Sequence, residues 1–550
     1  MHMDPPSQLT GAELAAAVPV VAMAAAIGAA YVGDRLGLGV APWIAGTAAL
    51  LSASALVATL RRRVRWRMAD TLALLLVVAS TLTYLLWLAW PALLPLGSGS
   101  DLTHHLQLVD YIERQGRLPH DASTVEFLGE MAAYTPGLHL LTAIAGRLTA
   151  GGLHALYPIV ALTVALKFGV FTLVLLRLFR SSPFRLPLAV AGTIAVLMVP
   201  TYSLGSFVED SFLAQVAAEL FAVFAWWALV AWDDEPDLVA IMLFAIAGVA
   251  IFLTWPIWIG PPVLTLALLI LTRRALSLRT RLAHASIALL PIALAAALHA
   301  SGRAEQASIV SASGAVIAPS LAVVGWALPL LSLAGLVLAA ARRRQLTAVY
   351  FTIAIAAQAA GLWTVAAGQT PYMAIKMTYL AIYPAIACAA VLLDAIGSRI
   401  VARRTTLVAR RVSLATAWIA VFVLGLAVRA DLPRRSRIRP VVSTDLAAAG
   451  IWARAHLPVH CVDYLVGNDY TAYWLHLAVL GNPRISSRTG DDDTFGTQSS
   501  MARWLVPGSP RYAIANLRIL PDEIRNDVIV LQQFGDVAVV ERRVPSTCPP

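Results

Sequence analysis

The sequence predicts a mainly α-helical, polytopic membrane protein with about 13 transmembrane helices in a bundle, followed by a small extracytoplasmic α/β domain. Of the 550 residues, 59% are hydrophobic and only 13% are charged, whereas soluble domains carry about 25% charged residues. The mean hydropathy is +0.74. Charged residues become frequent again only near the C-terminus. We therefore expect a transmembrane domain over residues 1–429 and an outer domain over 430–550.

The expected spans follow from the lengths of the apolar runs, because crossing a bilayer takes about 20 helical residues. The N-terminal stretch lacks the basic segment of a cleavable signal, so we expect the first run to stay as an anchor. The candidate spans are 12–33, 40–60, 69–96, 154–178, 186–206, 212–232, 238–255, 257–272, 282–299, 319–341, 346–366, 376–398 and 412–429.

Arginine clusters at the ends of these runs predict the orientation. If the N-terminus is cytoplasmic, the large clusters all lie in cytoplasmic loops, as the positive-inside rule requires. The C-terminal domain is then extracytoplasmic, and the plasma (inner) membrane is the expected location. The clusters also account for the net charge of +10 without a nucleic-acid partner. They lie at 61–67, 177–185, 273–281, 342–344 and 399–411, and the acidic turn 233–237 is the exception.

The segment 134–150 is the weakest point of this topology. It is too short to cross the bilayer upright, so we interpret it as a helix that dips into the outer leaflet. A full crossing at this point would invert the orientation of everything that follows.

The C-terminal region alternates helix-like and strand-like runs, which predicts a small α/β domain. Thr444 or Asp445 can cap the first helix. If the domain is extracytoplasmic, Cys461 and Cys548 could form a disulfide. The expected elements are a helix to about residue 455, a strand at 461–466, a helix at 470–480, strands at 512–516, 528–531 and 536–541, and a polar loop at 485–500.

A polar loop expected on the outer face, residues 97–136, contains an amphipathic segment. Its apolar residues recur at helical spacing and form one stripe, which predicts a helix lying at the membrane surface. The stripe consists of Leu102, Leu106, Val109 and Ile112.

Asp101 stands at the start of this helix, where the bilayer meets water. A carboxylate there could accept a proton from a hydroxyl group of a lipid-borne substrate, and partial burial would raise its pKa toward the range of a general base. The plain alternative is that Asp101 only caps the helix.

Two histidines follow Asp101 at helical spacing, so at least one shares its face of the helix. His104 and His105 could orient the carboxylate, bind a phosphate or contribute to a metal site, or they could simply be solvated. The sequence contains no compact set of ligands that completes a metal site, although a divalent cation remains possible.

Further polar residues fall on the same expected face and are candidates for substrate binding. Lys376 opens a span where an ammonium could meet a lipid phosphate, or it could only extend to the interface. Arg303 is a second phosphate candidate. The tryptophans of Trp255 to Trp258 are interpreted as an interfacial belt. The other candidates are Glu130, Tyr134, His139, Glu209 and Asp210.

Together these features resemble the GT-C superfamily of membrane glycosyltransferases, which use polyprenyl-phosphate-linked sugars. The likeness rests on Asp101 at the start of the first outer loop, the helix DLTHHLQLVDYIERQGRLP, the segment YTPGLHLLTAIAGRL, the span bearing Lys376 and the terminal α/β domain. Many members carry two acids in this loop, where this chain has an Asp-x-x-His-His arrangement.

The resemblance implies transfer with inversion from a polyprenyl-phosphate sugar to a cell-envelope polysaccharide, glycolipid or glycoprotein on the extracytoplasmic face. Asp101 would be the base, and Lys376, with Arg303 or a histidine, would stabilise the departing phosphate. Arabinose and mannose are the expected sugars in an actinobacterial-like envelope. No glycine-rich phosphate loop is visible, so no nucleotide cofactor is expected.

Other classes of protein stay open. A transporter or flippase for a lipid-linked substrate would show charged or broken helices near the bilayer midplane, where Lys167 is the lone clear charge. A polysaccharide polymerase or ligase usually lacks a large outer domain. A non-catalytic relative could act in envelope assembly.

Overall fold

The computed structural model describes most of the chain. The described residues are 9–97, 100–120, 128, 131–197, 201–300, 326–366, 370–403, 407–431, 439–440, 442–481, 501, 504–505, 510–544 and 546.

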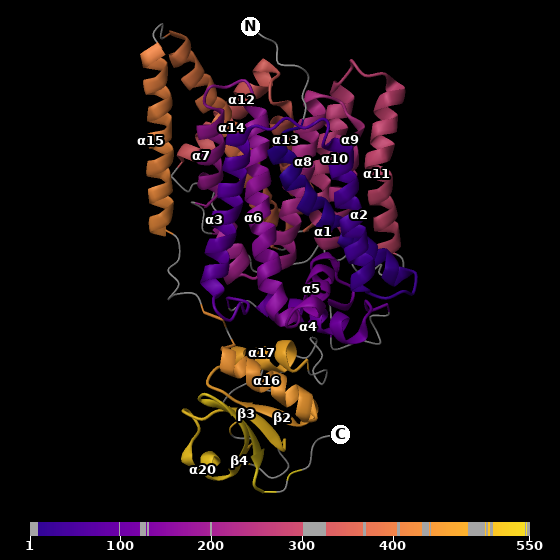
Figure 1. The fold of residues 1–550 in the computed structure, drawn as a ribbon, viewed down its shortest axis with the longest axis vertical. Helices are drawn as coiled ribbons and strands as arrows, with labels where there is room; N and C mark the ends of the chain where they lie inside the picture. The colour runs from indigo at the N-terminus through magenta and orange to yellow at the C-terminus, as the bar shows by residue number, and fades with distance from the viewer. Residues whose placement is uncertain are drawn as a thin grey trace.

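The described chain is a helical bundle with a small sheet-containing domain at one end (Figure 1), as predicted. Eight of its helices are long and apolar enough to cross a membrane, and five more are apolar but shorter. These helices correspond one for one to the predicted spans, so this is a multi-pass membrane protein. They are α1 (Gly11–Arg35), α2 (Pro42–Leu60), α3 (Met68–Ala89), α6 (Gly152–Leu178), α7 (Arg185–Leu197), α8 (Leu213–Asp234), α9 (Leu238–Thr254), α10 (Gly260–Thr272), α11 (Leu278–Ala300), α12 (Ala327–Arg342), α13 (Leu346–Val365), α14 (Tyr372–Arg403) and α15 (Leu407–Asp431).

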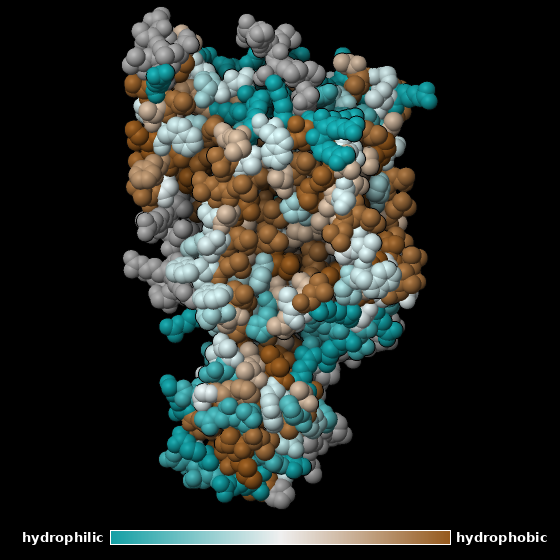
Figure 2. All heavy atoms as spheres, in the orientation of Figure 1, coloured by the Kyte–Doolittle hydropathy of each residue, from teal (hydrophilic) through white to brown (hydrophobic). Residues whose placement is uncertain are grey.

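Helices α6 and α8 form the centre of the bundle. The most apolar 18-residue window of α8 is 100% buried and that of α6 is 89% buried, whereas the corresponding window of α2 is 11% buried. A helix that is apolar all round is stable only where packing or lipid surrounds it. The central helices are therefore enclosed by protein, and α2 faces the surroundings, where Figure 2 shows a brown apolar band between two polar ends.

Several predicted boundaries shift for local reasons. Pro91 follows α3, which ends at Ala89, and proline disfavours helix continuation. The span predicted at 186–206 is divided between α7 and the π-helix η2 (Thr201–Glu209). Helix α14 begins before the predicted residue 376, which places Lys376 inside the helix and not at its opening.

The arginine clusters and the C-terminal domain lie at opposite ends of the bundle (Figure 1). At the arginine-rich end, Arg177 Nε donates to Asp234 Oδ2 at 2.8 Å, and Arg273 Nε donates to Asp233 Oδ1 at 2.9 Å. The acidic turn 233–237 is thus matched by arginines, which explains why it sits among basic loops.

The segment 134–150 does not cross the bundle. It forms α5 (Gly137–Leu148), and both ends of this helix lie at the end that carries the C-terminal domain. A Cβ on Gly137 would lie 2.9 Å from the carbonyl oxygen of Leu253, in the last turn of α9. Arg147 Nη1 donates to the carbonyl oxygen of Val40 at 3.2 Å, in the turn between α1 and α2. Residues 134–150 therefore do not change the side of the bundle on which the later spans begin and end.

The C-terminal domain contains the predicted α/β elements. A four-stranded sheet has the order β2-β3-β5-β4, with β2 and β3 parallel and the other pairs antiparallel. Ser443 caps the first helix and accepts from the Leu446 amide at 3.3 Å, where Thr444 or Asp445 was expected. The elements are α16 (Thr444–His456), η6 (Val459–Cys461), β2 (Val462–Leu465), α17 (Asp469–Trp474), η7 (Leu475–Val479), β3 (Tyr512–Asn516), α20 (Asp522–Asn526), β4 (Val528–Phe534) and β5 (Val537–Arg542).

The two cysteines among the described residues lie in different environments. Cys388 is free and buried within α14, whereas Cys461 is disulfide-bonded. Its expected partner, Cys548, and the loop expected at 485–500 lie outside the described residues.

Helix α4 (Ser100–Gln115) lies between the bundle and the C-terminal domain (Figure 1). The predicted stripe is buried, with Leu102, Leu106, Val109 and Ile112 no more than 2% exposed. Its other face is also covered, because α5 and α6 pack on it and η7 of the C-terminal domain contacts it. As predicted, the helix does not cross the bundle, but protein covers both of its faces.

Ionic contacts tie α4 to the C-terminal domain. Asp110 pairs with Arg114 one turn away, at 2.5 Å, and with Arg454 of α16. Arg114 Nη2 donates to the carbonyl oxygen of Gly481 at 3.1 Å, and Arg454 Nη1 donates to that of Val479 at 3.3 Å. The Asp110 carboxylate thus holds one arginine from each side of the junction, and both arginines donate to backbone carbonyls of the C-terminal domain.

We expect Asp110→Asn and Arg454→Gln each to loosen this junction. A double-mutant cycle should give a coupling energy of about 1 kcal/mol, because the pair is partly exposed, with faster hydrogen exchange in α16 for each variant. Arg511→Gln is the control, since Arg511 pairs with Glu541 inside the domain. Strictly additive effects of the two variants would contradict this role.

Candidate functional site

Asp101 lies in the first turn of α4, which begins at Ser100, so it is not the residue that precedes and caps the helix. It is partly buried. Burial raises the pKa of its carboxyl group, and the nearby charges of Lys376 and His104 act in the opposite direction. Because the charge of Lys376 acts on Asp101, the two side chains share one electrostatic environment.

The ammonium of Lys376 is enclosed by aromatic rings. Its Nζ lies 3.8 Å from the ring centre of Phe212, 4.6 Å from that of Tyr372 and 5.1 Å from that of Trp255. Ring faces attract cations at such distances. Lys376 is only 2% exposed, so it does not extend to the interface as a solvated lysine would. We call Lys376 and these three rings the lysine box.

The lysine box lacks a bonded counter-ion within the described part of the chain, where no acidic oxygen lies within 4.0 Å of Nζ. The carboxylates of Asp101 and Asp210 act on this charge from further away. A buried cation is costly unless an anion or several acceptors compensate it. The box is therefore suited to receive an anionic group.

A histidine pair lies beside the lysine box. His105 Nδ1 and His139 Nε2 are 2.9 Å apart and share one hydrogen bond, which either ring can donate depending on its tautomer. The Tyr134 ring stands edge-on to both, at 5.7 Å from His105 and 5.6 Å from His139, and lies 6.0 Å from Trp255. The pair thus connects α4 and α5 to the box.

Burial keeps both histidines neutral. It places the pKa of His105 well below 6.5, with the charges of His139, His104 and Lys376 adding to the effect, and it lowers the pKa of His139 to about 3. Between pH 6.5 and about 3, the unfolded chain binds protons that the folded chain does not. The contribution of the pair to stability is complete above pH 6.5 and declines as the pH falls.

We predict that unfolding stability falls with acidification by about 1.4 kcal/mol per pH unit for each histidine that stays neutral. His139→Gln should make this dependence shallower between pH 6 and 4, measured as the unfolding midpoint at each pH. His456→Gln, at an exposed position, serves as the control and should leave the slope unchanged. A parallel pH dependence of wild type and His139→Gln would contradict the prediction.

His104 connects the site to the C-terminal domain. Its Nε2 lies 2.8 Å from the hydroxyl oxygen of Tyr473, a residue of α17. His104 is therefore held by a side chain nearly 370 positions away, which no local pattern in the sequence indicates.

Of the remaining candidate residues, only Asp210 has a described side chain near the site. Asp210 is exposed just beyond η2, and its charge acts on Lys376. Glu209 ends η2, but its side chain is not among those described. Glu130 and Arg303 lie outside the described residues. Asp101, His104, His105, Tyr134, His139, Asp210 and Lys376 thus gather at one end of the bundle.

The box residues Phe212, Tyr372 and Trp255 were not predicted. Trp255 and Trp258 are 5% and 0% exposed, so their interpretation as an interfacial belt was wrong. The signal available was position, since all three rings flank predicted span ends on the same side as Asp101.

Among the described residues, no group of three or more His, Cys, Asp or Glu side chains is arranged to hold a metal ion.

A second charged cluster lies inside the bundle. Lys167 of α6 forms an ion pair with Glu219 of α8, and the Tyr383 hydroxyl donates to Glu219 Oε2 at 2.7 Å. Both charged side chains are 1% exposed. The expectation that Lys167 is the lone clear midspan charge was wrong, because Glu219 lies within the apolar run of α8 and pairs with it.

No protein-family model matches the chain, and no curated protein is significantly similar. Among solved structures, ArnT from Cupriavidus metallidurans bound to undecaprenyl phosphate aligns with 16% identity and a TM-score of 0.45, over 87% of this chain and 99% of that one. The apo state of the same protein aligns with 16% identity and a TM-score of 0.46, over 84% and 97%.

At these TM-scores the alignment assigns no role to any residue of this chain.

Proposed function

We propose that the chain is an integral membrane glycosyltransferase of the GT-C type that moves a sugar from a polyprenyl-phosphate donor to a cell-envelope acceptor. The observation that supports this most directly is the lysine box: a buried ammonium, lined by aromatic faces, in electrostatic reach of a carboxylate of raised pKa. A phosphate that enters beside Lys376 would bring the bond to its sugar near Asp101.

The proposed reaction is a single displacement. Asp101 takes the proton of an acceptor hydroxyl as the hydroxyl oxygen attacks the anomeric carbon. The bond from that carbon to the phosphate oxygen breaks, and the polyprenyl phosphate leaves with the electron pair. Lys376 stabilises the negative charge that develops on this phosphate. Attack opposite to the leaving group inverts the anomeric configuration.

The location of the site supports a lipid-borne donor. Lys376 lies near the start of α14, and Asp101 lies in α4, beneath the bundle at the end that carries the C-terminal domain (Figure 1). With the arginine-rich end in the cytoplasm, the reaction takes place on the extracytoplasmic face of the plasma membrane. Arabinose and mannose remain the proposed sugars, and a polysaccharide, glycolipid or glycoprotein the proposed acceptor.

A transfer assay on the purified full-length chain in liposomes tests this function. The donors are polyprenyl phosphates carrying labelled arabinose or mannose, offered with envelope glycan acceptors. We expect label in the acceptor, with inverted configuration at the anomeric carbon. A chain that transfers no sugar from any donor, although it binds the lipid, would overturn the proposal.

A flippase for a lipid-linked substrate is the second candidate, because the buried pair of Lys167 and Glu219 is the kind of intramembrane charge that transport pathways use. The same liposomes separate the two functions. Movement of labelled lipid between leaflets without transfer would favour the flippase, whereas transfer without movement would exclude it.

Lys376→Met should weaken binding of polyprenyl phosphate about tenfold or more, since a hydrogen bond to a charged group contributes about 1.5–3 kcal/mol. Binding is measured with the unglycosylated lipid phosphate, so that turnover does not enter. The neutral polyprenol, which lacks the phosphate, is the control ligand and should bind both proteins equally. A variant that binds the phosphate as tightly as wild type would contradict the assignment of Lys376.

A further inference from the structure

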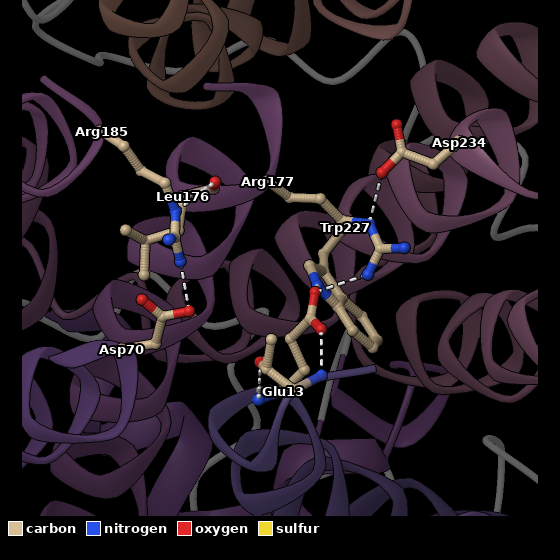
Figure 3. Close-up of polar contacts among 8 residues, drawn as sticks. Glu13, Asp70, Leu176, Arg177, Arg185, Trp227 and Asp234 are labelled. Atoms are coloured by element: carbon tan, nitrogen blue, oxygen red, sulfur yellow. Dashed lines mark hydrogen bonds and ion pairs between the residues drawn. The ribbon is translucent and has the colours of Figure 1, made fainter. Parts of the chain in front are cut away.

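The two ends of the bundle are held by different kinds of contact. At the arginine-rich end, ion pairs join membrane helices to one another, and Figure 3 shows Arg177 bonded to both Glu13 and Asp234. At the opposite end, polar contacts join α4 to the C-terminal domain. One of these contacts is made by His104, a residue of the candidate site, so this junction reaches the site itself.

The C-terminal domain holds α4 near both of its ends. In the second half of the helix, Asp110 pairs with Arg454 of α16. In the first half, His104 Nε2 lies 2.8 Å from the hydroxyl oxygen of Tyr473. Two separated contacts fix both the position and the direction of a helix. Asp101, in the first turn of α4, is therefore placed by the C-terminal domain as well as by the bundle.

The hydroxyl group of Tyr473 comes from an anchored helix. Asn468 caps α17 and accepts from the Thr471 amide at 3.3 Å, and Trp474, which follows Tyr473, is 1% exposed. The Tyr473 ring meets the His104 ring edge-on, with centres 6.3 Å apart. A hydrogen bond from an anchored partner restricts an imidazole ring to one orientation. The ring of His104 is held in this way.

His104 acts in turn on Asp101. Residues three positions apart are neighbours on a helix surface. Burial raises the pKa of Asp101, and the charges of Lys376 and His104 act against this rise. Such an interaction depends on the separation of the two charges. Holding the His104 ring therefore also sets how strongly it favours the Asp101 carboxylate.

Other titratable groups lie on or near α4 at this end of the bundle, and the effect of Tyr473 must be separated from theirs. They are His105 of α4, Tyr134, His139 of α5, His154 of α6, Asp210, Lys376 of α14 and His476 of η7. All of them are unchanged when His104 or Tyr473 is replaced. A comparison of those two variants therefore isolates the contact between the two side chains.

We propose that Tyr473 is a positioning residue for the proposed sugar transfer: it holds His104 beside Asp101, so that the C-terminal domain forms part of the reaction site. This role rests on the proposed function, whereas the contact between the two side chains does not. The domain then does more than cover the site, because Asp101 acts at its full rate only while α17 is docked on α4.

Tyr473→Phe tests this role, because it removes the hydroxyl group and keeps the ring. Transfer in liposomes at saturating donor should be about fivefold slower, as the loss of one hydrogen bond predicts, with unchanged affinity for the polyprenyl phosphate. On acidification, its rate should fall at a higher pH than that of wild type, in the direction of His104→Gln. Tyr470→Phe is the matched control, since Tyr470 lies on the same helix and is 52% exposed.

The double variant separates positioning from docking. His104→Gln with Tyr473→Phe should be no slower than His104→Gln alone, because no imidazole is left for the hydroxyl group to hold. If Tyr473 only docked the domain, its removal would slow wild type and His104→Gln by the same factor and leave the pH profile in place. That result would overturn the proposal.

A measurement without turnover separates this inference from the proposed function. In the full-length chain with ¹⁵N-labelled histidine, the Nε2 signal of His104 is identified by its loss in His104→Gln. It should shift in Tyr473→Phe and stay in place in Tyr470→Phe. If wild type transfers sugar but Tyr473→Phe matches its rate and pH profile, only the positioning role is refuted. If wild type transfers no sugar, the proposed function fails, and the signal alone decides whether Tyr473 holds His104.

Discussion

Asp101→Asn is expected to lower the rate of sugar transfer by about 10²–10⁴-fold, the usual contribution of a general base. Asparagine keeps the shape of the side chain and the start of α4 but cannot accept the proton of the attacking hydroxyl. Binding of the polyprenyl phosphate should be retained, because Lys376 and its aromatic rings are unchanged. Initial rates at saturating donor, with donor binding measured separately, give the two quantities.

The pH dependence of transfer provides an independent check. A base acts only when deprotonated, and burial raises the pKa of Asp101, so wild-type activity should fall on acidification at a higher pH than for an ordinary aspartate. Lys376 lowers the pKa of Asp101. On acidification, the residual transfer rate of Lys376→Met should therefore fall at a still higher pH. The residual rate of Asp101→Asn should not show this fall.

Asp237→Asn makes the same chemical change at the other end of the bundle and should transfer at the wild-type rate. Two results would contradict the role of Asp101. One is transfer by Asp101→Asn within tenfold of wild type, and the other is a loss of donor binding that matches the loss of rate. The second result would mean that Asp101 organises the site without acting as its base.

The spans could be predicted from the sequence because bilayer crossing depends on the length and polarity of single runs. The stripe on α4 and the strands of the C-terminal domain follow from equally local patterns. The lysine box could not be derived in this way, since Phe212, Trp255 and Tyr372 approach Lys376 only after α8, α9 and α14 pack together.

The contacts of His104 and His105 also depend on elements that are distant in the sequence and pack over α4. The sequence left open whether His105 is solvated, and in the structure α5 brings His139 and Tyr134 against it. The contact of His104 with Tyr473 depends on a domain that begins more than 300 residues later. Glu219 is different, because an acid within an apolar run is visible in the sequence, and an intramembrane charge requires a partner.

The pair of Lys167 and Glu219 carries the second large prediction, which concerns stability. Glu219→Leu removes the counter-ion of a lysine that is 1% exposed and leaves the Tyr383 hydroxyl without its acceptor. Removing one member of a buried ion pair destabilises a protein by about 3–5 kcal/mol. We expect a much lower unfolding temperature in detergent and a poor yield of folded protein. Because unfolding of membrane proteins is often irreversible, the scan rate must be kept constant.

Replacing both charges separates two costs. One is the loss of the attraction between Lys167 and Glu219, and the other is the burial of a single charge without a counter-ion. Lys167→Met with Glu219→Leu has no unpaired charge, and apolar replacement of a buried ion pair is often neutral or stabilising by about 1–4 kcal/mol. Adding Tyr383→Phe removes the last unpaired group. The combined variant should recover most of the stability that Glu219→Leu alone loses. If it unfolds as readily as the sum of its single variants, the two charges are not coupled. A stable combined variant that still transfers sugar would assign the pair to structure and count against the flippase, whose pathway would need the charges.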